Sequence, residues 1–302
     1  MEIINSPEMM RKMAVELRRQ GRTIGFVPTM GFLHEGHLSL VRLARREADV
    51  VVLSIFVNPL QFGPKEDFEK YPRDFARDTE LCRQNGVDIV FNPSAQDMYP
   101  GFDKGSAEAS LPDNTVFIDE NYLSKQLCGK SRPGHFRGVL TVVGKLFNLV
   151  LPDAAVFGQK DAQQAILIRR MIRDLNFPVR MIMAPIIREN DGLAMSSRNA
   201  YLSPDERRAA VCLSAALKSA RRLYRSRERD CKTLKSAMFD LISKVKSASI
   251  DYIEIVGEHN LKPLDKINGG DILIALAVRI GKTRLIDNLP LPDDRLGNLP
   301  DA

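Results

Sequence analysis

The run "DVVVLSIFV", residues 49–57, decides the fold of this 302-residue chain. It is almost continuously apolar and rich in β-branched side chains, which is typical of a strand buried inside a parallel sheet. The run therefore predicts an α/β core built around this strand.

Strands and helices alternate on both sides of this run. Ser6 and Pro7 predict a helix start, with Ser6 as N-cap and proline in the first turn, and Gly86 predicts a helix end. Strands are expected over residues 23–27, 87–91, 154–158 and 179–184, and helices over about 7–17, 38–48, 72–85, 138–150 and 161–175. Strands that alternate with helices in this way predict a doubly wound parallel sheet.

The pattern changes after residue 185, where we place a domain boundary. Ser203, Pro204 and Glu206 form a capping box that opens a helical run, and a second helix is expected over about 232–247. The stretches "IDYIEIV" (250–256), "DILIALAVRI" (271–280) and "TRLIDN" (283–288) alternate as antiparallel strands do. Residues 186–302 are therefore expected to form a smaller α+β domain that closes over the site of the first domain, residues 1–185.

Composition narrows the class of protein. Hydrophobic residues make up 44% and charged residues 27%, and no apolar run is long enough for a membrane span. The N-terminus lacks the features of a signal peptide, and the four cysteines form no CxxC pair, so we expect reduced thiols in the cytoplasm. The formal charge of +6 fits a mildly basic surface or an anionic substrate such as a nucleotide better than nucleic acid, because the chain has no run of five basic residues.

The stretch "PTMGFLHEGHLSLV", residues 28–41, lies between an expected strand and an expected helix. A glycine-rich turn at a helix start offers backbone N–H groups and the positive end of the helix dipole to a phosphate. His34 and His37 are three residues apart and share one face of the helix start, where an imidazole can stabilise charge on phosphoryl oxygens. A metal site, or a histidine that only caps or packs, are the alternatives. The stretch matches neither the Walker A loop nor the GxGxxG fingerprint.

Two further polar clusters suit a nucleotide. "VFGQKDAQQ" (156–164) follows a strand and opens a helix. In this cluster Lys160 can pair with a phosphate, and Asp161 can orient the lysine, cap the helix or hold magnesium. "LAMSSRN" (193–199) offers two hydroxyls and an arginine to a triphosphate. The alternatives are an ordinary capped helix start and a serine-rich loop between domains.

The remaining two clusters follow the same logic. Asn58 and Gln61 in "FVNPLQFGPKEDFEKYPRD" (56–74) come directly after the buried strand and are expected at its carboxyl end, although a surface loop is the alternative. "SRPGHFRG" (131–138), with Arg132, His135 and Arg137, is either a basic flap or a structural turn. The clusters at strand ends are expected to meet in one site, and together they predict nucleotide-dependent group transfer.

These stretches resemble, in order from about residue 20 to 205, the motifs of the pantothenate synthetase (pantoate–β-alanine ligase) family, with a weaker echo in "DYIEIV" and "GKTRLIDN". The histidine motif alone is similar to the HxGH element of all nucleotidylyl transferases and class I aminoacyl-tRNA synthetases. The resemblance implies a Rossmann-like N-terminal domain, a homodimer, and ATP-dependent condensation of pantoate with β-alanine through pantoyl adenylate, with release of AMP and pyrophosphate.

The resemblance also implies residue roles. His37 is the expected proton donor, with His34 and Lys160 as further catalytic residues. Gln61 and Gln164, with Asn58 beside them, are expected to hold pantoate, and Gln61 also lies near the β-alanine site. Mg²⁺ is expected with ATP, without assigned ligands. The expected ATP-binding residues are Met30, Gly31, Phe32, Leu33, His34, Glu35, Gly36, His37, Gly158, Gln159, Lys160, Asp161, Ile187, Met195, Ser196, Ser197 and Arg198.

Two rival functions share parts of this pattern. A nucleotidylyl transferase that adenylates a phosphate acceptor needs a basic acceptor pocket and has no use for paired glutamines. A tRNA-binding module needs a basic domain that the last 115 or so residues do not evidently supply. Arg137 is a local departure from the family pattern, on a segment that could alter β-alanine access.

Overall fold

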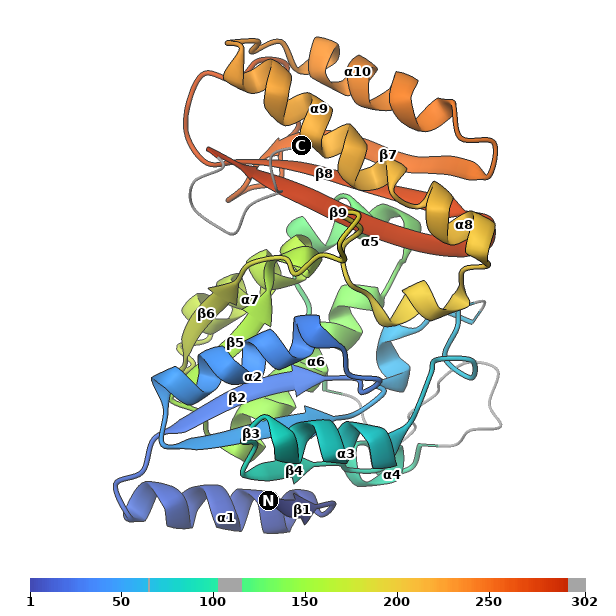
Figure 1. Cartoon of the computed structure of the whole chain (residues 1–302). Coiled ribbons are helices and arrows are strands. Elements are labelled where there is room, and N and C mark those ends of the chain that lie inside the picture. The colour runs from blue at the N-terminus through green and yellow to red at the C-terminus, as the bar shows by residue number, and fades with distance from the viewer. Residues whose placement is uncertain (65, 103–115, 293–302) are drawn as a thin grey trace. The chain divides into compact units, whose positions relative to one another are not determined.

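The computed structural model describes residues 1–64, 66–102 and 116–292, and the chain divides into two compact units (Figure 1). The first unit comprises Met1–Lys125, Arg132–Phe157 and Leu167–Ala184. The second comprises Gln126–Ser131, Gly158–Ile166 and Pro185–Ala302. Two short segments that precede residue 185 in the sequence thus group with the C-terminal part of the chain.

A six-stranded sheet with the order β1-β4-β3-β2-β5-β6 forms the centre of the first unit. The pairs β1–β4, β4–β3, β3–β2 and β2–β5 run parallel. All six residues of β3 are buried, which confirms the prediction made from the apolar run. The strands are β1 (Glu2–Ile4), β2 (Ile24–Thr29), β3 (Val50–Ile55), β4 (Ile89–Phe91), β5 (Ala154–Gly158) and β6 (Arg180–Ala184).

Helices cover both faces of this sheet. Val41 of α2 and Cys82 of α3 join Val27 of β2 in one buried apolar cluster. Phe26, next to Val27, points to the opposite face because strand side chains alternate, and α1 and α6 both contact β2. The doubly wound α/β prediction is therefore confirmed. The α-helices are α1 (Pro7–Arg19), α2 (Glu35–Glu47), α3 (Phe75–Gln84), α4 (Ala95–Met98), α6 (His135–Val150) and α7 (Ala162–Asp174), and the short 3-10 turns are η1 (Pro59–Gln61) and η2 (Leu123–Lys125).

Several element boundaries differ from expectation. Helix α6 begins at His135 rather than at Gly138. Gly138 lies inside the helix, where glycine is required because a Cβ would clash with the Leu60 carbonyl oxygen. Helix α3 begins at Phe75, since the Asp74 carboxylate caps it by accepting from the Arg77 amide. The short edge strand β1 was not predicted, because three residues carry too little pattern to reveal a strand.

The second unit is built on an antiparallel sheet with the order β7-β8-β9, as the alternation in the sequence predicted. Helices α9 and α10 lie along one face of this sheet, where Leu217, Leu234 and Ile274 join one apolar cluster (Figure 1). Ser203 and Glu206 form the predicted capping box at the start of α8. The elements are α5 (Cys128–Ser131), η3 (Gln159–Asp161), η4 (Ser197–Tyr201), α8 (Pro204–Ala209), α9 (Cys212–Arg225), α10 (Cys231–Ser243), β7 (Ala248–Gly257), β8 (Ile272–Ile280) and β9 (Thr283–Leu291).

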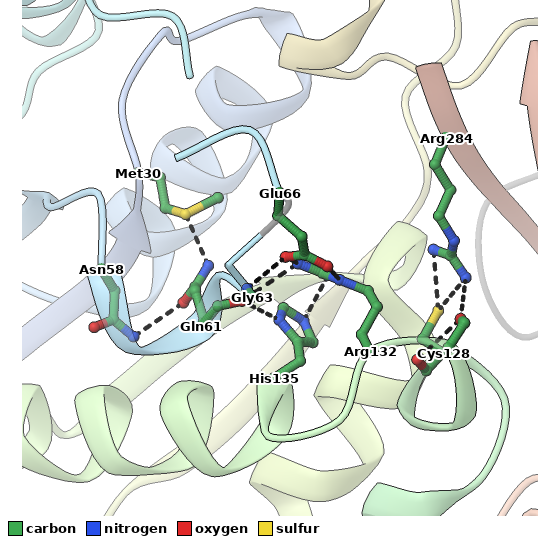
Figure 2. A network of polar contacts seen from close by, with 10 residues as sticks. Met30, Asn58, Gln61, Gly63, Glu66, Cys128, Arg132, His135 and Arg284 are labelled. Atoms are coloured by element: carbon green, nitrogen blue, oxygen red, sulfur yellow. Dashed lines mark hydrogen bonds and ion pairs between the residues drawn. The ribbon is translucent and has the colours of Figure 1, made fainter. Parts of the chain in front are cut away.

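The four cysteines are buried and form no disulfide. In the second unit Arg284 of β9 donates to Cys128 Sγ at 3.5 Å and to Ser131 Oγ at 3.3 Å, and so holds α5 against the sheet (Figure 2). Within the described ranges of the chain, no helix combines the length and the apolarity that crossing a membrane requires.

Candidate active site

The loop that follows β2 is held in an unusual backbone conformation. Gly31 has φ +81° and Phe32 has φ +50°, both in the left-handed region that favours glycine. A Cβ on Gly31 would lie 2.9 Å from Ile55 Cγ2, so close packing also requires glycine here. The Thr29 hydroxyl donates to the Ser54 carbonyl at 2.7 Å and accepts from the Gly31 amide at 3.1 Å. The strand end and the loop are thus joined rigidly.

Asp78 of α3 fixes the next two residues of this loop. Its Oδ2 accepts from the Phe32 amide at 2.6 Å and its Oδ1 from the Leu33 amide at 2.8 Å, and its side chain is 1% exposed. Burial raises the pKa of the Asp78 carboxyl against the opposing effect of these two amides. Asp78 was not singled out from the sequence. The available signal was a carboxylate on the face of α3 that also carries buried Cys82.

The two histidines lie together at the start of α2. His34 is the N-cap, and the rings of His34 and His37 have centroids 4.1 Å apart. The His34 amide donates to His37 Nδ1 at 3.3 Å, so the neutral His37 ring carries its proton on Nε2. His37 therefore presents a donor at the far side of its ring.

The amides of this loop are largely committed within the protein. Those of Gly31, Phe32 and Leu33 donate to Thr29 and Asp78, and that of His34 donates to His37. The glycine-rich turn was expected to offer its N–H groups to phosphate. Because these four already have acceptors, a phosphate contact at this loop falls to the imidazoles and to the first turn of α2.

A cavity of about 660 Å³ borders the same loop within the first unit. It is lined by Met30–Phe32, by residues 55–57 at the end of β3 and by residues 92–96 after β4, among others. Ligands bind at the carboxyl ends of strands in open α/β sheets, and this cavity lies at that edge. Its lining includes Asp78 but not the histidines or Gln61, so it overlaps the candidate site only at Met30–Phe32.

Gln61 ends the 3-10 turn η1, which is the next element after β3. Its Nε2 donates to Met30 Sδ at 2.8 Å and its Oε1 accepts from Asn58 Nδ2 at 3.2 Å (Figure 2). The expected pantoate residue therefore lies against the first residue of the expected ATP loop. Asn58 also donates to the Gly138 carbonyl and accepts from the Tyr99 hydroxyl and the Leu60 amide. All the hydrogen-bonding capacity of the Asn58 amide is thus used inside the protein.

A charged network holds the backbone of Gln61 in place. Arg132 donates from Nε and Nη2 to the two oxygens of Glu66, each at 2.6 Å, and from Nη1 to His135 Nε2 at 3.0 Å (Figure 2). Since His135 Nε2 accepts, its proton lies on Nδ1, which donates to the Gln61 carbonyl at 2.7 Å. Burial acts to raise the pKa of Glu66, but the hydrogen bonds and charge of Arg132 outweigh it and the pKa is lowered.

In this network, part of the stretch "SRPGHFRG" has the structural role that was one of its two interpretations. Arg132 and His135 tie the stretch to Gln61, whereas the Arg137 guanidinium lies 3.8 Å from the centroid of the Phe117 ring. Glu66 completes the network and was not singled out from the sequence, since nothing in its surroundings there pairs it with Arg132, 66 residues away.

In the second unit the turn η3 carries the expected lysine. Lys160 Nζ lies 3.3 Å from Asp161 Oδ2, so the carboxylate orients the ammonium group. Asn288 of β9 donates from Nδ2 to the carbonyl oxygens of Gln159 and Lys160, each at 3.0 Å. Gln159 returns a bond from Nε2 to Asn288 Oδ1 at 2.9 Å. Gln164 lies in the first turn of α7, three residues after Asp161.

The other expected nucleotide residues of this unit lie on a hairpin and the turn after it. The Met195 amide donates to the Ile187 carbonyl at 3.0 Å, which brings these two residues side by side. Ser196 caps η4 by accepting from the Arg198 amide, and Ser197 is buried. Arg188, next to Ile187, forms a bidentate ion pair with Asp287 at 2.6 and 2.9 Å. Both side chains of this pair are buried.

The expected residues thus gather in two sets. Met30–His37, Asn58 and Gln61 belong to the first unit, and the second unit holds Gly158–Asp161, Gln164, Ile187 and Met195–Arg198. Among the described residues, no three His, Cys, Asp or Glu side chains group as ligands for a metal ion.

Comparison with known proteins identifies the family. The model of the family "Pantoate-beta-alanine ligase" matches residues 2–290. The chain belongs to the pantoate-beta-alanine ligase family. Pantothenate synthetase of Thermotoga neapolitana is 56% identical over 288 residues, which are 95% of this chain and 99% of the relative. The corresponding enzyme of Heliobacterium modesticaldum is also 56% identical, over 96% of this chain and 99% of the relative.

Solved structures of the ligase family share the fold. Pantothenate synthetase from Thermus thermophilus has a TM-score of 0.86 and 43% identity, over 96% of this chain and 99% of that one. Pantoate-beta-alanine ligase from Francisella tularensis, solved with β-γ ATP and β-alanine, has a TM-score of 0.73 and 35% identity, over 96% and 97%. The reaction expected from the sequence is confirmed: the protein is a ligase that joins pantoate to β-alanine in pantothenate biosynthesis.

Proposed function

We propose that this ligase first adenylates pantoate with ATP and then passes the pantoyl group to β-alanine, using the two sets of residues described above. The observation that carries the proposal is the histidine pair at the start of α2, with the His37 proton on Nε2 and Met30 against Gln61. β2 and β5 are neighbouring parallel strands, so the loops that follow them leave the sheet at the same edge. The assignment of both sets to one reaction rests on the resemblance to the family.

In the first step a pantoate carboxylate oxygen attacks the α-phosphorus of ATP, and the bond to pyrophosphate breaks. Negative charge grows on the phosphoryl oxygens, where the His37 Nε2–H and the Lys160 ammonium act as stabilising donors, with His34 beside them. Ser196, Ser197 and Arg198 are assigned to the β- and γ-phosphates, which leave together. The first turn of α2, with Glu35 and Gly36, supplies amides and the positive end of the helix dipole.

In the second step the β-alanine amine attacks the carbonyl carbon of the adenylate, and the bond from that carbon to the AMP oxygen breaks. The nitrogen loses a proton as the amide forms. No side chain has to act as a covalent nucleophile in either step. Positioning of the two reactants and exclusion of water are the main contributions asked of the protein.

Pantoate carries both a carboxylate and hydroxyls, and an amide side chain can donate and accept at once. We therefore assign pantoate to Gln61 and Gln164, and the adjacent β-alanine position to Gln61. Asn58, whose polar atoms are occupied by Gln61, Gly138, Tyr99 and Leu60, is assigned a positioning role for Gln61 rather than a substrate contact.

Magnesium fits this set of residues as an ion carried by ATP. Mg²⁺ usually takes one or two carboxylates together with substrate phosphates and water. Asp161, whose side chain is 47% exposed beside Lys160, is the carboxylate that would hold it. When bound, the ion offsets the charge of the triphosphate.

Pyrophosphate exchange tests the proposal. Labelled pyrophosphate should enter ATP in the presence of pantoate and Mg²⁺ with β-alanine absent, and omission of pantoate should abolish the exchange. Addition of β-alanine should then convert the intermediate to product with AMP. Formation of ADP would refute the adenylate route, and exchange without pantoate would indicate another acceptor.

The division into domains at residue 185, which follows the change of pattern there, and the cytoplasmic location, which follows the cysteines and the N-terminus, belong to the same proposal. The closure of residues 186–302 over the site and the homodimer belong to it as well and rest on the resemblance to the family. Light scattering of the purified protein tests the dimer: a mass near twice 33.9 kDa is expected, and a monomer over the whole working range of concentration would remove it.

A further inference from the structure

Two consecutive residues of β9, Asp287 and Asn288, contact the two loops of the second unit that are assigned to ATP. Their exposed fractions are 2% and 3%, which is unusual for an aspartate and an asparagine side by side. Both residues end the stretch "GKTRLIDN" (281–288), for which no contact with the nucleotide site was predicted from the sequence. Contact with water therefore does not explain why polar residues occupy these two positions.

The geometry of a strand sends these two side chains to opposite faces of the sheet. Leu285 and Leu289 have the same parity as Asp287 and belong to the apolar cluster with α9 and α10. Asp287 thus lies on the face that carries the helices, and Asn288 on the other. One strand segment reaches both loops because they approach it from its two faces.

Asn288 holds the turn η3 through the backbone. Its two Nδ2 hydrogens go to the carbonyl oxygens of Gln159 and Lys160, each at 3.0 Å, and its Oδ1 accepts from Gln159 Nε2 at 2.9 Å. The carbonyl groups of the turn therefore point toward β9. The Lys160 side chain leaves from a backbone position that cannot shift without breaking these bonds.

Asp287 holds the second loop through Arg188. The bidentate pair leaves 7% of the Arg188 side chain and 1% of the Asp287 side chain exposed, and Arg188 Nη1 also donates to the Gly192 carbonyl at 3.0 Å. That bond closes the hairpin in which Ile187 and Met195 pair. Asp287 Oδ1 in addition accepts from the Asn288 amide at 2.8 Å, which joins the two anchors.

We propose that Asp287 and Asn288 form a positioning pair that sets the spacing between Lys160 and the Ser196–Arg198 turn, so that both loops grip one triphosphate. The proposal rests on the assignment of these loops to ATP. Adjacent residues of a strand are about 3.3 Å apart and cannot change that separation, so a pair of this kind fixes two loops more tightly than two independent anchors. Neither residue touches the nucleotide itself.

The test measures ATP affinity by calorimetry with a non-hydrolysable ATP analogue, without pantoate. Asn288→Ala and Asp287→Asn should each weaken binding by roughly 10-fold or more, since each leaves a buried polar group of a nucleotide loop without its partner. Asn288→Ser removes the same bonds and keeps the test available if Asp287→Asn yields little folded protein.

Leu285→Ala is the matched control on the same strand. It opens a cavity in the core beside α9 and lowers Tm, but the folded protein should bind the analogue as the wild type does. In steady-state kinetics Asp287→Asn should raise the KM for ATP and leave the KM for β-alanine unchanged, a split that general destabilisation does not produce.

Two results overturn the proposal in distinguishable ways. If Lys160→Ala and Ser197→Ala weaken binding while the Asp287 and Asn288 variants bind like the wild type at a lower Tm, the pair is a structural anchor only. If Lys160→Ala and Ser197→Ala themselves bind ATP normally, the loops are not nucleotide loops, and the assignment beneath the proposal is what failed.

Discussion

The loop after β2 and the turn after β5 are anchored in opposite senses. Asp78 accepts from the amides of Phe32 and Leu33, so it takes up donors of the first loop. Asn288 donates to the carbonyls of Gln159 and Lys160, so it takes up acceptors of the second and leaves the amides of the turn to other partners. An anion needs donors, so the two loops should serve ATP by different groups.

Because of this difference, we expect the first loop to bind ATP mainly through side chains and the turn η3 to use its backbone as well. The first loop, with its amides engaged, should act through the imidazoles of His34 and His37 and through the first turn of α2. The turn η3 should act through its amides as well as Lys160. Glycine-rich loops at helix starts thus look alike in sequence, whereas the anchor decides which atoms remain for the ligand.

The largest effect is expected from His37. His37→Ala should fold normally and lose about 10²–10³-fold in turnover, because the first loop has few backbone donors to replace a transition-state donor. Ser39→Ala, two residues further along α2, is the control and should keep near-native turnover. Near-native turnover in folded His37→Ala would contradict the side-chain role of this loop.

The two glutamines assigned to pantoate give the next largest effect. Gln164→Ala should leave a charged or hydroxyl group of pantoate without its partner, at a cost of about 1.5–3 kcal/mol in kcat/KM for pantoate. Gln61→Ala should cost a similar amount, and ATP binding measured alone should change little in both variants.

Gln163→Ala is the matched control for Gln164→Ala. Gln163 accepts from the Cys128 amide at 2.9 Å and donates to the Gln126 carbonyl at 2.7 Å, so its loss should lower Tm and leave pantoate kinetics nearly unchanged. Equal losses of ATP binding and pantoate use in Gln164→Ala would show that the pocket assignment is wrong.

Asp78→Asn tests the anchor of the first loop directly. The asparagine side chain keeps one acceptor oxygen, but its NH2 group faces a backbone N–H of the loop. One of the two backbone amides therefore loses its hydrogen-bond partner. We expect roughly a 10-fold loss of kcat/KM for ATP, from one hydrogen bond to a charged group. Asp74→Asn on the same helix should change little, since asparagine caps a helix about as well as aspartate. Unchanged kinetics in Asp78→Asn would mean that the left-handed backbone holds the loop alone.

The smallest expected effect concerns pH and the Glu66–Arg132–His135 network. The Glu66 pKa is lowered from its ordinary 4.5, so the folded state binds this proton less tightly than the unfolded chain does. The stability from ionised Glu66 is full above pH 4.5 and is lost as the pH falls through the lowered folded-state pKa. Tm measured from pH 7 down to pH 3 should therefore fall less steeply in Glu66→Gln than in the wild type. Glu69→Gln, at an exposed position, is the control. If Tm falls equally steeply with pH in all three proteins, the network does not contribute to the pH dependence of stability.

The sequence carried the groups that we propose to meet the substrates. Their motifs are local: a strand end, a glycine-rich turn and a helix start follow one another within about ten residues, and each has a known preference for phosphate. The His34–His37 pair, the Lys160 turn and the Ser196–Arg198 turn could therefore be identified with no knowledge of the fold. The buried run over residues 49–57 indicated the α/β class for the same reason, because periodicity is a property of neighbouring residues.

The sequence could not supply the partners of these groups, because each partner lies far along the chain. Asp78 is 46 residues from Phe32, Arg188 is 99 from Asp287, and Asn288 is 129 from Gln159. Long-range hydrogen bonds and ion pairs leave no local period, and a lone buried carboxylate or amide looks like any surface residue until the chain is folded. The sequence by itself thus determined the fold class and the groups proposed to react. Only the tertiary structure decided which loop atoms are engaged and which remain for the ligand, because that depends on which distant side chains packing brings within hydrogen-bond distance.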